Sequence, residues 1–219
     1  KREAMQVPYL RKLLLSDSIH ISNKITVENM EPVSAFLGKL GDPGQDGLSL
    51  AEFKRRQKLH HQAEVAALLD VPAFIHKARD IYGYRHFIND AGGSVCELDS
   101  REVLETLAEH TLIVYLKIPP ALERAIVERA KSAPKPLYYR EAFLDEKLPE
   151  FLQSQHYREV CDIPPDDFVT WIFPELFKSR VPRYQAIADE FGYTVDAGDA
   201  NKVESETDFL RLIANALPA

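Results

Sequence analysis

The stretch DAGGS occupies residues 90–94 and directly follows a short apolar run. Glycines allow backbone N–H groups to approach a phosphate closely, and an acid at the end of a strand can bind Mg²⁺ directly or through water. These residue types predict that Asp90 binds a magnesium ion, and that Gly92, Gly93 and Ser94 lie against a phosphate. The alternative is that the stretch is simply a turn between a strand and a helix.

A second set of residues that suits phosphate chemistry follows the next apolar stretch. It combines long cations, prolines and tyrosines: Arg124, Arg129, Lys131, Pro134, Lys135, Pro136, Tyr138, Tyr139 and Arg140. Cations on a proline-hinged segment can close over a polyphosphate and neutralise the charge that develops during transfer. The alternative is a surface helix–turn–helix whose cations form ion pairs with neighbouring acids, which stabilise little. The tyrosines either stack on a base or anchor the core.

The elements that must position these residues alternate between strands and helices. Residues 111–118 are almost continuously apolar and β-branched, which is typical of a strand buried on both faces. Further strands are expected at 86–90, 157–163 and 193–197. Helices are expected at 49–70, 72–83, 99–110, 119–132, 164–179, 182–192 and 206–217, and a further helix is expected within 133–155, after a basic, aromatic hinge. This alternation predicts βα units and an α/β fold with a mostly parallel sheet, in which ligands collect at the carboxyl ends of the strands.

The N-terminal part has a different character. Residues 8–15 are expected to form a short helix, residues 18–27 an extended segment, and residues 38–47 a glycine-rich loop. We therefore expect a helical region over 1–84 and an α/β core over 85–219, with a lid-like segment at 131–145.

Composition excludes several classes of protein. The 219 residues carry a formal net charge of -7, which argues against a nucleic-acid binder with its concentrated basic face. No apolar run approaches the roughly 18 residues that a membrane span needs. Cys96 and Cys161 have no CxxC partner, so neither a disulfide framework nor a thiolate zinc site is expected, and a reducing cytoplasm is the predicted location.

The order of motifs over residues 85–145 resembles the second half of a P-loop NTPase of the small-molecule kinase or ATPase type, such as the shikimate and gluconate kinases. The stretch DAGGS is followed by LIVYLKIP and then by ERAIVERAKSAPKPLYYREAF. In those kinases a similar strand precedes a helix and an arginine-rich lid with an Arg-Pro-Leu signature, which residues 135–137 match with lysine in place of arginine. The stretch is also similar to uncharacterised bacterial proteins labelled only as ATPases.

The resemblance implies a parallel sheet flanked by helices, with Mg²⁺ and ATP bound at the strand ends and a small molecule as acceptor. By resemblance, Asp90 takes the position of the metal-binding or acceptor-binding acid, and Arg129, Lys135 and Arg140 are the lid cations. The helical segment from 48 to 83 would cover the acceptor.

The chain departs from this family at the phosphate loop. The pattern G-x-x-x-x-G-K-[ST] does not occur in the 219 residues. In these kinases the loop follows the first strand, so we expect it either upstream of Lys1 or lost from this relative. The second case favours a non-catalytic interaction module on a degenerate nucleotide-binding fold. Its binding surface would be the helix with Trp171, Phe173 and Phe177, or the acidic C-terminal segment.

Overall fold

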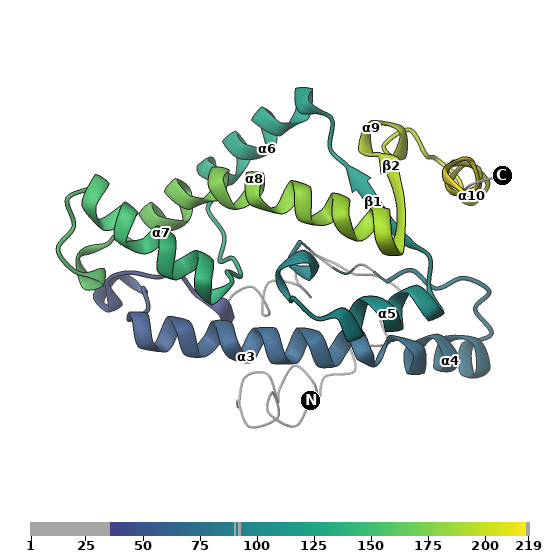
Figure 1. The fold of residues 1–219 in the computed structure, drawn as a ribbon, viewed down its shortest axis with the longest axis horizontal. Coiled ribbons are helices and arrows are strands. Elements are labelled where there is room, and N and C mark those ends of the chain that lie inside the picture. The colour runs from purple at the N-terminus through teal and green to yellow at the C-terminus, as the bar shows by residue number, and fades with distance from the viewer. Residues whose placement is uncertain (1–35, 90, 92, 218–219) are drawn as a thin grey trace. The chain divides into compact units, whose positions relative to one another are not determined.

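The computed structural model describes residues 36–89, 91 and 93–217. The predictions for residues 8–15 and 18–27 lie outside this range, as do Asp90 and Gly92. The described part is mostly helical and contains a two-stranded sheet (Figure 1). None of its helices is both long and apolar enough to cross a membrane.

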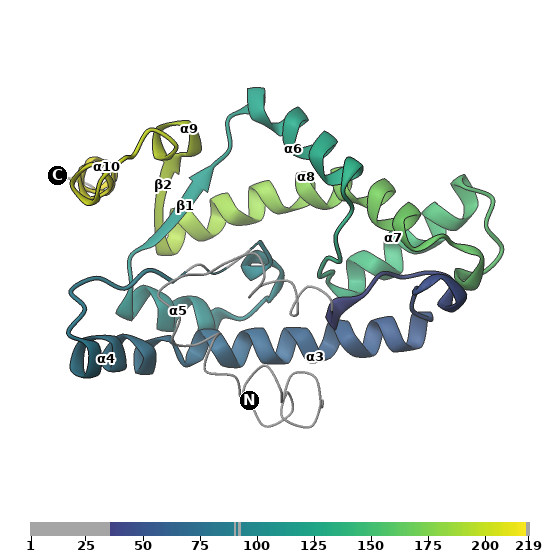
Figure 2. The ribbon, with the colours of Figure 1, turned by 180° about the vertical axis from the view of Figure 1, so that it is seen from behind.

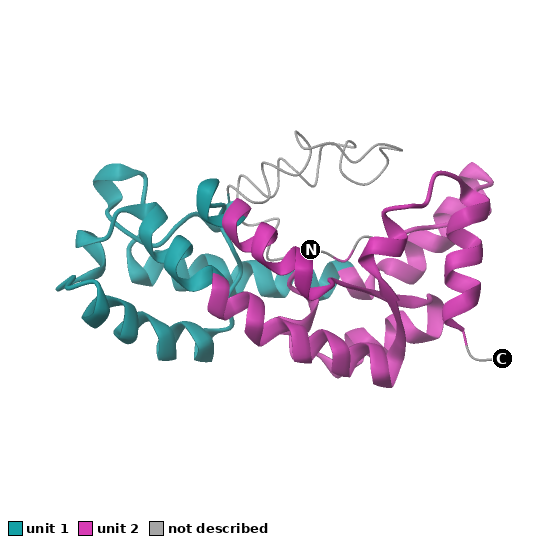
Figure 3. Cartoon of the chain, turned by 90° about the horizontal axis from the view of Figure 1, so that it is seen from above, with its two compact units in different colours: residues 1–67, 130–173 teal, residues 68–129, 174–219 magenta. Residues whose placement is uncertain are grey.

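The chain divides into two compact units, each built from two stretches of sequence (Figure 3). The described residues of unit 1 are 36–67 and 130–173, and those of unit 2 are 68–129 and 174–217. The domain boundary expected after residue 84 therefore lies inside unit 2.

In the described part of unit 1, helices pack around an aromatic core. They are most of α3 (Leu50–Leu69), α7 (Glu141–Ser154) and the first part of α8 (Pro165–Phe191) (Figure 2). The ring of Phe168 lies 5.2 Å from that of Phe151, edge to face, and 5.9 Å from that of Tyr139. Burial of such rings dominates the stabilisation of a small core.

The strand expected at residues 157–163 is absent, and this prediction was wrong. A 3₁₀ helix, Val160–Asp162, occupies the segment instead. Glu159 and Asp162 form a reciprocal capping box, so the side chains satisfy backbone N–H groups that a strand would offer to a neighbour. The completely buried Ile163 then accepts a 2.8 Å hydrogen bond from the backbone of Asp42.

Unit 2 contains the sheet. Strands β1 (Ile113–Lys117) and β2 (Gly192–Asp196) pair in parallel, with Ile113 opposite Gly192 and Lys117 opposite Asp196. This confirms the strands expected at 111–118 and 193–197 and their parallel pairing. The expected burial of the first strand on both faces was wrong, because the Leu116 residue is 48% exposed and Lys117 is exposed as well. Gly192 is required here, because a β-carbon at this position would overlap the carbonyl oxygen of Ile113.

The helices of unit 2 confirm the local start and stop signals in the sequence. They are α4 (Val71–Tyr82), α5 (Arg101–His110), most of α6 (Pro120–Ser132), the rest of α8, α9 (Ala197–Ala200) and α10 (Glu206–Ala216). Ser100 caps α5 by accepting a hydrogen bond from the Val103 backbone. Gly83 ends α4 with φ at 64°, a left-handed conformation that favours glycine.

Two further predictions were wrong. Residues 86–89 form no strand in the structure, and the Ile88 residue is 76% exposed. A parallel strand needs a neighbour for its backbone groups, and the sheet within the described residues consists of β1 and β2. The helices expected at 164–179 and 182–192 are one continuous helix, α8, with Pro174 and Pro182 inside it. Buried side chains on both sides of the prolines, including Ile172 and Ala188, offset the lost helical hydrogen bonds.

Candidate functional site

The segment that follows the predicted strand end lies on the surface of unit 2. Gly93 is exposed and Ser94 is half-buried, and a short 3₁₀ helix, Val95–Glu97, comes next. Asp90 and Gly92 lie outside the described residues, so their predicted roles stay predictions. We call residues 93–99 the glycine segment.

Arg183 fixes the glycine segment to α8. Its Nε donates a 2.7 Å hydrogen bond to the carbonyl of Cys96, and its guanidinium also pairs with the Asp99 carboxylate. Asp99 has φ at 48°, which is uncommon for a residue other than glycine. The arginine thus contacts the backbone of Cys96 and the side chain of Asp99 within the same turn.

Arg180, one turn earlier on α8, forms a second attachment. Its Nε lies 3.5 Å from Oε1 of Glu97, whose side chain is 1% exposed. A buried carboxylate needs a compensating charge, and Arg180 supplies it. Nη1 of the same guanidinium lies 3.7 Å from the place that a β-carbon on Gly93 would occupy. The cation is therefore next to the exposed glycine.

Cys96 is the buried residue of the glycine segment, and its side chain interacts with Tyr184 of α8. Burial raises the pKa of the Cys96 thiol to about 11, so this thiol is neutral at pH 7 and is a poor nucleophile. Burial also raises the pKa of Tyr184, whose ring stacks on Tyr115 of β1 at 5.5 Å. The glycine segment, α8 and β1 consequently form one packed group within unit 2.

The carboxyl ends of the two strands carry charged side chains. Lys117 ends β1 and donates a 3.0 Å hydrogen bond to Gln185 of α8. Asp196 ends β2 and accepts a 2.7 Å hydrogen bond from the Gly198 backbone. Open parallel sheets usually bind ligands at this edge, so the ligand site predicted from the sequence would lie near these groups.

The predicted lid cations are distributed over both units. Arg129 is exposed on α6 and belongs to unit 2. Lys135 and Arg140 both belong to unit 1. Lys135 is exposed, and Arg140, the N-cap residue of α7, is half-buried. Their joint action on a phosphate stays a prediction.

The tyrosines of the lid-like segment are buried in unit 1. The ring of Tyr138 lies 5.5 Å from that of His60 and 6.1 Å from that of His61. Gln57 of α3 bridges the neighbouring backbone, donating to the Leu137 carbonyl at 3.1 Å and accepting from the Tyr139 N–H at 2.9 Å. These contacts favour the core-anchor alternative for the tyrosines over base stacking.

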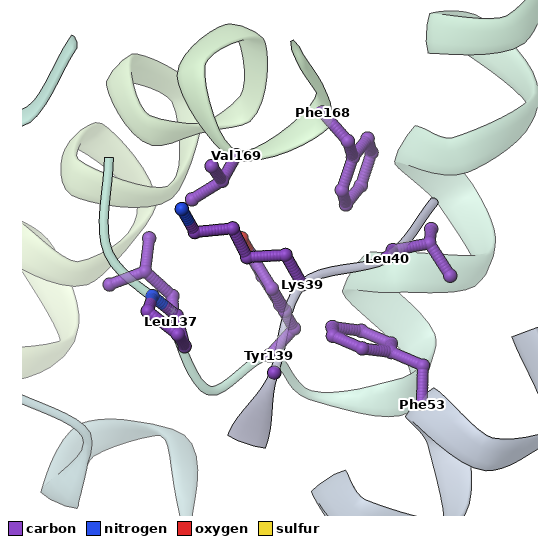
Figure 4. Close-up of a pocket in the computed structure, with 9 residues that line it drawn as sticks. Lys39, Leu40, Phe53, Leu137, Tyr139, Phe168 and Val169 are labelled. Carbon is purple, nitrogen blue, oxygen red and sulfur yellow. The ribbon is translucent and has the colours of Figure 1, made fainter. Parts of the chain in front are cut away.

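A small pocket lies between this segment and the loop before α3 (Figure 4). It is lined by Gly38, Lys39, Leu40, Phe53, Pro136, Leu137, Tyr139, Phe168 and Val169. The volume that the centre of a water-sized sphere can occupy is about 10 Å³, which is room for about one water. Ligand pockets are typically about 300 Å³ or larger, so this pocket does not bind a nucleotide.

The described residues supply no metal-binding group of three or more His, Cys, Asp or Glu side chains. The expected Mg²⁺ site therefore depends on Asp90, which lies outside the described residues. Sequence reasoning missed Arg180, Arg183 and Gln57. Arg180 and Arg183 lie one turn apart on a helix whose buried residues are largely apolar. This spacing places both arginines on one face of the helix, and it was the pattern that could have indicated a shared contact.

Comparisons of the chain with protein-family models, with curated proteins and with solved structures found no match.

Proposed function

We propose that the protein is an ATP-dependent phosphotransferase or ATPase. The observation that supports this most is the exposed Gly93 beside the Arg180 guanidinium, in the unit that contains the parallel strands. A small exposed residue beside a guanidinium suits the binding of a phosphate.

The proposed roles follow from the chemistry of each side chain. Asp90 binds Mg²⁺ or orients a small-molecule acceptor, and the backbone of residues 92–94 lies against the phosphates of ATP. Arg129, Lys135 and Arg140 neutralise charge on the transferring group. Mg²⁺, when bound, supplies further neutralisation of the phosphate oxygens. We place the protein in the cytoplasm, where ATP and a reducing environment suit its unpaired cysteines.

The test is a thermal-shift titration of the natural full-length protein with Mg-ATP. A ligand that binds the folded state raises the melting temperature as its concentration exceeds Kd. We expect Asp90→Ala and Lys135→Ala to reduce the shift. Lys178→Ala is the matched control, because this lysine is on α8 with a side chain that is 74% exposed and pairs with Glu175. The proposal is wrong if Mg-ATP produces no shift in the parent protein.

The second candidate is a non-catalytic interaction module. The predicted surface around Trp171 is not what favours it, since this ring is half-buried and packs 5.3 Å from Phe151. Large apolar side chains exposed in unit 2, such as those of Ile81 and Ile88, favour it instead. A protein without an Mg-ATP shift that still binds a partner through unit 2 would support this candidate.

A further inference from the structure

The segment after α4 contacts one face of α10 within unit 2. Nε2 of His86 lies 3.0 Å from Oε1 of Glu206, the first residue of α10. Phe209 and Leu210 follow Glu206 by three and four positions, so they lie on the same face of the helix. Phe87 directly follows His86 in the chain. The contact therefore brings apolar residues from two parts of the chain to one region of the surface.

These apolar residues remain exposed. The exposed fractions of Phe87, Ile88, Phe209 and Leu210 are 39%, 76%, 36% and 46%, and we call these four residues the apolar face. No residue of α10 is buried, although the helix has the amphipathic pattern of one that packs on a partner. Grouped apolar residues on a surface typically mark an interaction site.

Two unpaired charges of opposite sign belong to the same region. Arg85 precedes His86, and Glu204 lies two positions before Glu206. Both Arg85 and Glu204 are exposed, and neither forms an ion pair with another described residue. An isologous interface brings the same patch of two copies together, so that each residue meets its counterpart's neighbour twice. A patch with one free cation and one free anion can therefore be complementary to itself.

Both signs of charge in this region favour a second copy of the chain over a strongly basic or strongly acidic partner. The formal net charge of -7 makes two copies repel each other at long range. Reciprocal contacts between Arg85 and Glu204 would offset this repulsion locally and select which surfaces meet. Burial of the apolar face would supply the main driving force.

We propose that the apolar face is the interface of a two-fold symmetric homodimer, in which Arg85 of each protomer pairs with the partner's Glu204. The dimer does not depend on the proposed phosphotransferase or ATPase activity.

The test is sedimentation velocity of the natural full-length protein at rising concentration, with charge reversals that a symmetric interface must rescue. We expect the parent to form a dimer. Arg85→Glu and Glu204→Arg each place like charges opposite one another at both pairs, so each alone should raise the dimer Kd about tenfold. The double variant, and an equimolar mixture of the two single variants, restore opposite charges and should recover the parent Kd.

Two further variants complete the test. Leu210→Ser removes part of the apolar face and should also weaken the dimer. Lys58→Glu is the control, because it makes the same change in net charge as Arg85→Glu at an exposed position of unit 1. Its Kd should match that of the parent.

The proposal is overturned if the parent stays monomeric, which would assign the apolar face to a different partner. It is also overturned if the charge reversals leave the Kd unchanged, or if the double variant fails to recover it, since association would then not use the Arg85–Glu204 pairs. The measurement contains no nucleotide. A failed dimer therefore leaves the proposed function standing, and a missing Mg-ATP shift leaves the dimer standing.

Discussion

Gln57 joins two parts of unit 1 that are distant in the sequence. It is 5% exposed, and both atoms of its amide bond to the backbone of residues 137–139. We expect Gln57→Ala to lower the free energy of unfolding by about 2 kcal/mol or more, because a buried group without a partner costs about 1–3 kcal/mol. Urea unfolding followed by circular dichroism measures the change.

Lys58→Ala is the matched control for this substitution. Lys58 is the next residue of α3 and is exposed, so its removal should change the unfolding free energy by less than about 0.5 kcal/mol. Equal stabilities of the two variants would show that the bridge to residues 137–139 does not form.

For single residues, the sequence predicts a contact when the partner lies a few positions away in the chain. The expected ranges 72–83 and 99–110 match α4 and α5 to within two residues, because the Gly83 end and the Ser100 cap act on backbone groups a few residues away. Arg183 and Gln57 were missed because their partners lie 80 or more residues away. Glu97 was missed because glutamate is almost never fully buried unless it is paired, and the sequence does not reveal that pairing.

Among the elements, the β1–β2 pair depends on a close approach of two backbones. A β-carbon at Gly192 would lie closer to the Ile113 carbonyl oxygen than real β-carbons approach backbone atoms. We expect Gly192→Ala to reduce the unfolding free energy by about 1–3 kcal/mol, the usual cost of overpacking. Urea unfolding and the far-ultraviolet circular dichroism of the sheet test this.

Gly93→Ala is the control at the level of the element. It places the same methyl group in the same unit, where the structure provides space. If both alanine variants are equally stable, the register that places Ile113 opposite Gly192 is incorrect.

Elements with a strong local pattern were predicted, and those that depend on a distant neighbour were not. β1 is a continuous apolar run, and α5 has both a cap and an amphipathic face, so each has its own signal. Residues 86–89 have the composition of a strand, but composition does not specify a pairing partner. α8 was divided in the prediction because proline usually ends a helix, and only the packing on both sides of Pro182 shows otherwise.

Over the whole molecule, exposed apolar residues are unevenly distributed. All eleven large apolar residues exposed among the described residues belong to unit 2: Ile81, Tyr82, Tyr84, Phe87, Ile88, Leu112, Leu116, Leu122, Phe209, Leu210 and Leu217. Exposed apolar surface promotes association. We expect the chain to self-associate with rising concentration in sedimentation velocity, and Ile88→Ser to weaken this association.

Lys178→Ser is the control for association, since it changes an exposed polar residue of the same unit. A chain that stays monomeric at high concentration, or an Ile88→Ser variant that associates like the parent, would contradict the expectation.

Pro182, one of the two prolines inside α8, has a consequence for the glycine segment. Pro182 lies between Arg180 and Arg183 and has no N–H to bond to the carbonyl of Lys178, so the helix is weaker along its axis at that turn. The two arginines hold this turn from the side, through Glu97 and Cys96. The glycine segment therefore stabilises this turn of α8, and the turn stabilises the segment, because a coupling free energy between two sites is the same in both directions. Whatever tightens the glycine segment must therefore also tighten the middle of α8, and slower amide hydrogen exchange around residue 182 would report occupancy of the segment.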